Sequence, residues 1–375
     1  MRAWWFELLA GCSFEPGIAP GDGGGSGSDG GIDGMSPDAM IDAMSIDTPP
    51  GSTLRQKTIT IDAAITGTHT DFPLWISLLD SDLAARARAD GTDIHFVQGS
   101  VELDFEIQRW TKNEGRLEAW VRVPSLATNT QIAIRYGDVA AAHAPDAPGT
   151  FAGYNAVWHL DDALNQSTIA DTRNQTNGTG VGLGPSDSVA AQLGRGIAFG
   201  DDAERITFTN PLSGNTAHTI SVWINQAATN TNDAIIAMGN PVQHQARWFH
   251  SRYFAPTIAV GFYTNDYVNP NEDIIGDGWV LLHWVYEGTN RMTRLYRNGA
   301  QVGSTFQHMP GVNTQGTAGT IGNTHDGFGT NMGINATLDE IRIINVARSA
   351  AWIAAEALNQ ATPVQFYSVS AEQMP

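Results

Sequence analysis

The chain has 375 residues, enough for two or three domains. Its 20 Lys and Arg residues against 39 Asp and Glu residues give a formal net charge of −19, which argues against a nucleic-acid partner and against docking on anionic lipid. The single cysteine excludes an internal disulfide framework and a cysteine-rich metal centre. Abundant glycine and few charged residues favour a β-rich fold with many turns.

The amino terminus carries one basic residue, Arg2, then a short apolar run and Cys12. Leu9-Ala10-Gly11-Cys12 resembles the bacterial lipobox, in which the cysteine is lipidated and becomes the first mature residue. This resemblance implies a lipoprotein signal peptide over residues 1–12, with lipid (palmitate) on Cys12. It also implies an outer-membrane protein exposed at the cell surface, which contacts the membrane only through that anchor. The alternative is a poorly ordered terminus with a free cysteine.

Residues 13–52 are rich in Gly and Asp and contain no Lys or Arg. A segment of low hydrophobicity and one sign of charge cannot bury enough apolar surface to fold. We therefore predict a disordered linker over residues 13–52.

Short alternating segments fill residues 53–145 and predict a small antiparallel β-sandwich. The expected strands are 58–61, 74–78, 93–97, 101–110, 117–123 and 131–136, with a helical turn at 82–89. Four segments, 71–73, 90–96, 119–124 and 135–138, resemble a bacterial domain of unknown function that commonly precedes a laminin-G-like domain. No activity is established for that family, so the resemblance implies a fold and a context only.

Glu102, Asp104 and Glu106 alternate within the expected strand 101–110, which would place three carboxylates on one face. This is the layout of laminarinase-like retaining glycosidases. Retention needs two carboxylates about 5 Å apart, and positions i and i+4 of a regular strand are farther apart than that. A solvated strand face explains the same alternation. We keep a glycan-cleaving hydrolase using Glu102 and Glu106 as an alternative, and expect no catalytic residues.

The pattern of residues 152–368 predicts a second, larger β domain. Asn298-Gly299 marks a hairpin turn, residues 338–344 form the expected last strand, and Ser349 begins a short helix. The segments that carry a resemblance are Trp158-His159, 198–200, 218–223, 295–299, 338–343 and 347–349. Together they resemble a laminin-G-like, concanavalin A-like jelly roll. The resemblance implies an all-β chain in which the small sandwich is followed by this jelly roll, a fold that hosts both lectins and glycosidases.

Candidate ligand residues lie in the aromatic stretch 245–267. Aromatic rings stack on the apolar faces of sugars, and neighbouring amides and carboxylates bind hydroxyl groups. On this ground we expect Trp248, Tyr267, Asn265 and Asp266 to bind a ligand. Most aromatic residues of this stretch would otherwise fill the core.

Calcium is the ion that this composition favours, because Ca²⁺ takes oxygen ligands from carboxylates and carbonyls. Related sandwiches hold a structural Ca²⁺, and the resemblance points to Asp339 first and Asp171 second. The Asp201–Asp202 pair offers a third candidate, Asp202. A capping or pairing role for Asp339 within the sheet is the alternative.

The sequence therefore predicts a surface-displayed, non-catalytic binding or adhesion lipoprotein that recognises a glycan or a surface protein. The hydrolase is one alternative, and a purely structural surface module is the other. The ligand and the oligomeric state are left open.

Overall fold

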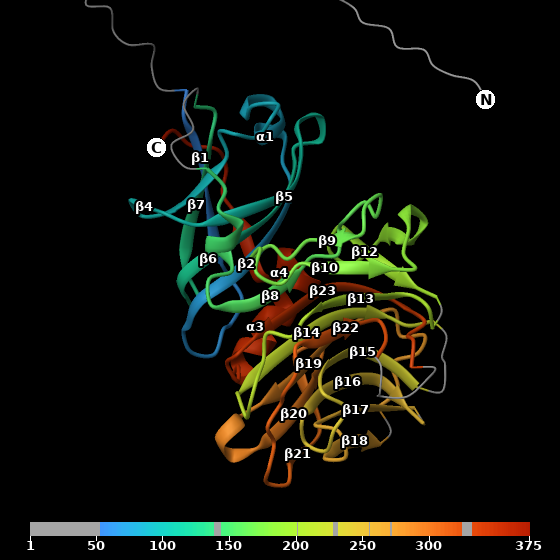
Figure 1. Ribbon diagram of the computed structural model, residues 1–375. Coiled ribbons are helices and arrows are strands. Elements are labelled where there is room, and N and C mark those ends of the chain that lie inside the picture. The colour runs from blue at the N-terminus through green and yellow to red at the C-terminus, as the bar shows by residue number, and fades with distance from the viewer. Residues whose placement is uncertain are drawn as a thin grey trace, which may run out of the picture. The chain divides into compact units, whose positions relative to one another are not determined.

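The computed structural model of the chain describes residues 53–138, 144–200, 202–227, 232–254, 256–270, 272–324 and 332–375 (Figure 1). These residues belong to one compact unit that spans Pro50–Pro375. The unit is almost entirely antiparallel β-structure and contains two pairs of sheets, which we call the first and the second module.

The first module pairs a five-stranded sheet, in the order β24-β1-β7-β3-β4, with a three-stranded sheet, in the order β2-β6-β5. Its strands are β1 (Arg55–Ile61), β2 (His69–Leu79), β3 (His95–Gln98), β4 (Val101–Glu102), β5 (Phe105–Thr111), β6 (Arg116–Leu126), β7 (Gln131–Tyr136) and β24 (Tyr367–Val369). Its helices are α1 (Ser81–Arg86) and the 3₁₀ turn Lys112–Glu114. Alternation explains the core, because Ile59 and Ile61 of β1 point inward between more polar neighbours.

The expected continuous strand 101–110 is wrong, because the chain breaks between Glu102 and Phe105. Strand β4, which carries Glu102, pairs with β3 in the five-stranded sheet. Strand β5, which carries Glu106, pairs with β6 in the three-stranded sheet. The buried side chains of Leu103 and Phe105 anchor the crossing from one sheet to the other.

The second module stacks two eight-stranded sheets. The outer sheet, as we call it, contains β9 (Thr168–Ile169), β10 (Gly178–Val181), β13 (Arg205–Thr209), β15 (Asn232–Gly239), β16 (Ala246–Tyr253), β17 (Thr257–Gly261), β18 (Asp266–Pro270) and β22 (Ala318–Ile321). The inner sheet contains β8 (Tyr154–Trp158), β11 (Ser188–Ala190), β12 (Arg195–Phe199), β14 (His218–Asn225), β19 (Trp279–Tyr286), β20 (Met292–Arg297), β21 (Ala300–Gln307) and β23 (Ala336–Ile344).

The core of the second module lies between these sheets. Phe249 and Val260 from the outer sheet pack in the same cluster as Trp284 and Leu282 from the inner sheet. The short helix α2 (Ala147–Thr150) and the 3₁₀ turns Pro185–Asp187 and Gly288–Asn290 lie in the connections. The Asn298-Gly299 turn is confirmed, since both residues have positive φ and the turn joins β20 to β21.

Helix α3 (Ala350–Ala361) joins the two modules. Its start at Ser349 is confirmed, because the Ser349 hydroxyl accepts a hydrogen bond from the Trp352 N–H at 3.2 Å. The helix contacts β2 of the first module and β21 of the second (Figure 1). Trp352 and Ile353 of its buried face pack in the core of the first module.

After α3 the chain returns to the first module through α4 (Pro363–Phe366) and β24. Strand β24 pairs with β1, with Ile59 opposite Val369. Of the helices that the structure describes, none is long and apolar enough to cross a membrane.

Candidate functional site

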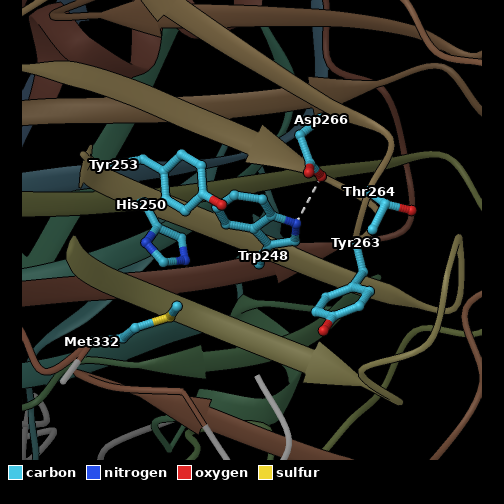
Figure 2. A pocket seen from close by; sticks show the side chains of 7 residues that line it. All are labelled: Trp248, His250, Tyr253, Tyr263, Thr264, Asp266 and Met332. Carbon is cyan, nitrogen blue, oxygen red and sulfur yellow. Dashed lines mark hydrogen bonds between the residues drawn. The ribbon is translucent and has the colours of Figure 1, made fainter. Parts of the chain in front are cut away.

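A pocket of about 200 Å³ opens on the face of the outer sheet that points away from the core (Figure 2). It is formed by β16, by the turn that joins β17 to β18, by the first residue of β18, and by one residue that precedes β23. The residues that line it are Trp248, His250, Tyr253, Tyr263, Thr264, Asp266 and Met332. Aromatic rings and a few polar groups in one concave site are the usual composition of a small-molecule pocket.

The alternation of β16 places two of these side chains in the pocket. Phe249 points into the core between the sheets, so Trp248 and His250 point to the opposite face. The residues opposite them on neighbouring strands are small: Ala237 pairs with Trp248, and Ala259 pairs with His250. Small neighbours leave room above the sheet beside the indole ring.

The turn between β17 and β18 has an unfavourable backbone. Tyr263 and Thr264 have φ of 47° and 65°, in the left-handed region that Gly and Asn prefer. The Phe262 N–H donates to the Asn265 carbonyl at 3.2 Å and closes the two-residue turn. A strained turn that carries two pocket residues is a feature more common at functional sites than elsewhere.

Asp266 is held against Trp248 across the sheet. The Trp248 Nε1–H donates to Asp266 Oδ1 at 2.9 Å (Figure 2). Burial raises the pKa of the Asp266 carboxyl to about 6, although this hydrogen bond and backbone N–H groups act in the opposite direction. The carboxylate is therefore an acceptor whose charge changes close to neutral pH.

Gly261 makes this arrangement possible. It is opposite both Trp248 and Asp266 in the two strand registers. A Cβ atom at position 261 would lie 2.2 Å from Asp266 Oδ1 and 2.6 Å from the Asp266 Cα. Only glycine allows the carboxylate to lie over this strand and reach the indole.

His250 supplies a buried neutral nitrogen at the pocket. Its side chain is 1% exposed, and burial lowers its pKa to about 3. Its ring lies edge-on to Trp248, with 4.4 Å between the ring centroids. Within the described part of the chain, His250 Nδ1 has no hydrogen-bond partner. The Nδ1 atom is itself shielded from solvent, so this nitrogen is not exposed in the cavity.

Tyr253 covers the indole from one side. Its ring lies 4.7 Å from that of Trp248 and 5.5 Å from that of His250, edge-on in both cases. The three rings form an aromatic cluster, in which the Tyr253 hydroxyl points toward the Trp248 ring (Figure 2). Such a cluster presents both apolar ring surface and hydrogen-bonding groups.

The structure brings together two of the four predicted ligand residues. Trp248 and Asp266 line the pocket, whereas Tyr267 and Asn265 point to the other side. Tyr267 stacks on Phe306 at 5.0 Å in the core, and its hydroxyl accepts the Ser304 N–H. The Asn265 side-chain amide bonds the backbone N–H and carbonyl of Met309.

The three predicted metal residues do not form a common site. Among the described residues, no three His, Cys, Asp or Glu side chains are grouped so as to hold a metal ion. The Asp171 carboxylate accepts four backbone N–H groups, from Val157, Arg173, Gln175 and Thr176.

Asp339 and Asp202 are bound to the backbone in the same way. Asp339 Oδ2 accepts the Leu193 N–H at 2.8 Å, and burial raises the pKa of Asp339 well above its usual value, which favours the protonated form. Asp202 Oδ1 accepts the Gly333 N–H at 3.0 Å. One oxygen of each of these two carboxylates is therefore engaged by a backbone N–H group. The calcium ion stays a prediction.

The alternative pair Glu102 and Glu106 is separated by the sheet crossing. Glu106 accepts the Thr172 hydroxyl at 2.8 Å and lies 3.2 Å from His159 Nε2, so it belongs to the junction between the modules. Asp104 pairs with Arg122 at 2.9 Å. The three carboxylates therefore do not line one strand face. The predicted lipid site, Cys12, lies outside the described residues.

The sequence also carried signals for residues that were not predicted to bind. His250 follows Trp248 by two positions, and the period of a strand places both on one face. Tyr253 and Tyr263 belong to the same aromatic stretch 245–267. Met332 is distant in sequence and has no local signal.

Two family models match parts of the chain. Residues 199–354 match the family Laminin_G_3, described as the concanavalin A-like lectin/glucanases superfamily. Residues 90–168 match DUF2341, a domain of unknown function. The chain thus carries a concanavalin A-like domain preceded by DUF2341. No curated protein matches the chain significantly.

Three similar solved structures are distant in sequence. The binding domain of Paraclostridial Mosquitocidal Protein 1 is 14% identical, with 55% of this chain and 52% of that chain covered and a TM-score of 0.39. Domain 4 of the arabinanase AbnA from Geobacillus stearothermophilus, in complex with arabinotriose, is 17% identical, with 54% and 98% covered and a TM-score of 0.40. The sialidase CBM40 of Ruminococcus gnavus, bound to α2,3-sialyllactose, is 12% identical, with 43% and 96% covered and a TM-score of 0.34. The chain spans about half the length of the first of these.

Proposed function

We propose that the concanavalin A-like domain binds carbohydrate in the pocket formed by Trp248, His250 and Asp266. The observation that carries this proposal is the joint placement of an aromatic cluster and a half-buried carboxyl group around one cavity. A sugar ring offers an apolar C–H face and several hydroxyl groups, which match these two kinds of group.

Each residue has a distinct role in this proposal. The ring edges of Trp248 and Tyr253 contact the apolar face of the sugar. Asp266 accepts a hydrogen bond from a hydroxyl group, and an ionised acceptor makes a stronger bond than a neutral one. His250 packs edge-on against Trp248 and holds the indole ring in place. The cavity of about 200 Å³ is smaller than the usual pocket for a drug-sized ligand, so it holds one sugar ring.

A glycan array probed with the full chain tests the proposal. We expect saturable binding to a subset of glycans, and loss of most of that binding in Asp266→Asn and in Trp248→Ala. Asp90→Asn is the matched control, because Asp90 is an exposed carboxyl in the first module that pairs with Arg88. Binding that survives in both pocket variants would move the site elsewhere, and no binding by the wild-type chain would overturn the proposal.

Glu106→Gln separates binding from the hydrolase alternative. The proposal expects unchanged glycan binding in this variant, because Glu106 lies at the junction between the modules and not in the pocket. A hydrolase that uses Glu106 would release reducing sugar from a bound glycan, and Glu106→Gln would abolish that release. Reducing-sugar assays on the glycans that bind the array therefore decide between the two.

We also propose that the chain is displayed at the bacterial cell surface by lipid on Cys12. The support is the lipobox-like Leu9–Cys12 and the acidic, Gly-rich segment 13–52 that follows it. Glycan binding on such an anchor is an adhesion function. Metabolic labelling with a palmitate analogue should mark the wild-type chain and not Cys12→Ser, and the variant should leave the membrane fraction. Equal labelling of both chains would overturn the anchor.

A further inference from the structure

Phe254 lies beside the pocket and is exposed to solvent. Its side chain is 65% exposed, among the largest exposures of an apolar residue in the described chain. Its ring lies 4.5 Å from that of Tyr253, edge-on, and Tyr253 lines the pocket. The Tyr253 ring thus lines the pocket on one side and contacts the Phe254 ring on the other.

The backbone at Phe254 is held in an unfavourable conformation. Its φ is 58°, in the left-handed region where a bulky side chain is an outlier. The Phe254 N–H donates to Oδ1 of the buried Asn232 at 3.0 Å, which fixes this conformation. The Thr257 hydroxyl donates to the Tyr253 carbonyl at 3.0 Å and fixes the neighbouring residue. The fold therefore holds a large aromatic ring in solvent at a position where glycine would be less strained.

We infer that Phe254 and Tyr253 form a second sugar-binding subsite next to the pocket, so that the ligand is an oligosaccharide and not a single sugar. This inference rests on the proposed carbohydrate function of the pocket. One sugar ring occupies the cavity beside Trp248, and the next ring along the chain stacks on the exposed face of Phe254. Such a role explains both the exposed ring and its fixed backbone. Because the ring is already held in place, little conformational entropy is lost when a sugar stacks on it.

Chain-length dependence of binding tests this inference. The probes are the one-, two- and four-unit members of gluco-, galacto-, xylo- and arabino-oligosaccharide series, measured by calorimetry on the full chain. We expect the wild-type affinity to rise on going from one unit to the longer members of the series that binds. In Phe254→Ala the gain in affinity from one unit to the longer chains should be about threefold to tenfold smaller, which is the range of one aromatic contact. The single sugar should bind as it does to the wild type.

Phe254→Gly provides a readout that a structural role would not give. Glycine adopts this φ without strain, so we expect a melting temperature equal to or above that of the wild type together with the loss of the chain-length effect. Phe254→Tyr should keep the chain-length effect. Leu79→Ala is the control for removing an exposed apolar side chain, because Leu79 is 68% exposed in the first module.

The outcomes are distinguishable. If single sugars bind the wild type as tightly as longer chains, or if Phe254→Ala keeps the full chain-length effect, the second subsite is wrong and the pocket stands. If no glycan of the array and no member of these series binds the wild type, the pocket and the second subsite are both overturned.

Discussion

His159 contacts two carboxylates that belong to different modules. Its Nδ1 lies 2.7 Å from Glu340 Oε1 in the second module, and its Nε2 lies 3.2 Å from Glu106 Oε2 in the first. Glu340 also accepts two hydrogen bonds from Arg342, which stacks on the Trp120 ring of the first module at 4.0 Å. A buried ionic network therefore crosses the junction between the modules.

Breaking this network should destabilise the whole unit. Glu340→Gln leaves Arg342 and His159 short of one buried counter-charge, and we expect a loss of about 3–5 kcal/mol in the free energy of unfolding. Urea denaturation followed by tryptophan fluorescence measures it. Glu114→Gln, at an exposed pair with Arg116, is the control and should leave the free energy of unfolding nearly unchanged, because exposed ion pairs contribute little. Equal effects of the two changes would contradict a role for the network.

The same network makes stability depend on pH through His159. Burial lowers the pKa of His159, but the attraction of Glu340 and Glu106 outweighs burial and raises the pKa well above the usual value. A raised folded-state pKa gives stability that is present below the unfolded value of about 6.5 and is lost as the pH rises through the folded value. As the pH rises through the alkaline range, the free energy of unfolding should therefore fall less in His159→Gln than in the wild type. A fall of the same size in the variant would assign the pH dependence to other groups.

The protonated form of Asp266 should favour stability, whereas the ionised form should favour glycan binding. Its folded-state pKa of about 6 lies above the unfolded value of about 3.9, so its contribution to stability is present below pH 4 and is lost as the pH rises through 6. Asp266→Asn should therefore be more stable than the wild type at pH 8, by about 1–3 kcal/mol, and not at pH 4. Thermal melts at both pH values measure this, and glycan affinity should fall in the same variant. A variant that is less stable at pH 8 would contradict the assigned burial cost.

Gly261→Ala should remove glycan binding without changing any group that contacts the sugar. The added methyl group would lie 2.2 Å from Asp266 Oδ1, so the carboxylate must leave its place beside Trp248. We expect at least a tenfold loss of affinity, as for the removal of one charged hydrogen bond of about 1.5–3 kcal/mol. Gly67→Ala is the control, because a Cβ atom there meets nothing within 4 Å. Gly67 has a φ of 80° and Gly261 is not in the left-handed region, so backbone strain in the control affects stability and not the pocket. Affinity that survives in Gly261→Ala would place Asp266 outside the site.

Tyr367 of β24 tests whether the two modules unfold together. Its ring is buried in the first module, and its hydroxyl accepts the Ser77 N–H at 2.8 Å. Tyr367→Ala should cost about 3–5 kcal/mol, and Tyr367→Phe about 1–2 kcal/mol, because only the hydrogen bonds of the hydroxyl with the Ser77 N–H and carbonyl are lost. Both variants should keep a single calorimetric transition, since α3 and β24 bind the modules together. Two separate transitions would show independent modules.

Local patterns in the sequence predicted much of the fold. The strand with Leu338, the Asn298-Gly299 turn and the Ser349 cap were predicted because each depends on neighbouring residues. The break after Glu102 was not, because the alternation of 101–110 continues across a change of sheet. The position of Glu340 was not predicted either. Its φ is 52°, and the residue lies at a bulge where the register between β23 and β14 changes.

The candidate site was half predicted for a similar reason. Trp248 and Asp266 were chosen from the composition of the stretch 245–267, but composition does not tell which face of a strand a residue occupies. Asn265 and Tyr267 flank Asp266, and both point to the other side. The Tyr263-Thr264 turn decides which face of β18 each of these residues occupies. A two-residue turn of this kind usually contains Gly or Asn, and neither Tyr263 nor Thr264 signals it.

The pairing of β24 with β1 constrains the order in which the protein can fold during synthesis. Strand β1 is translated before the second module, whereas Val369, which pairs with Ile59, is translated after it. The outer edge of β1 therefore stays unpaired until the second module and α3 have been made. A sheet closed by contacts of such sequence separation forms late and slowly. The first module thus completes its five-stranded sheet only after the second module has left the ribosome.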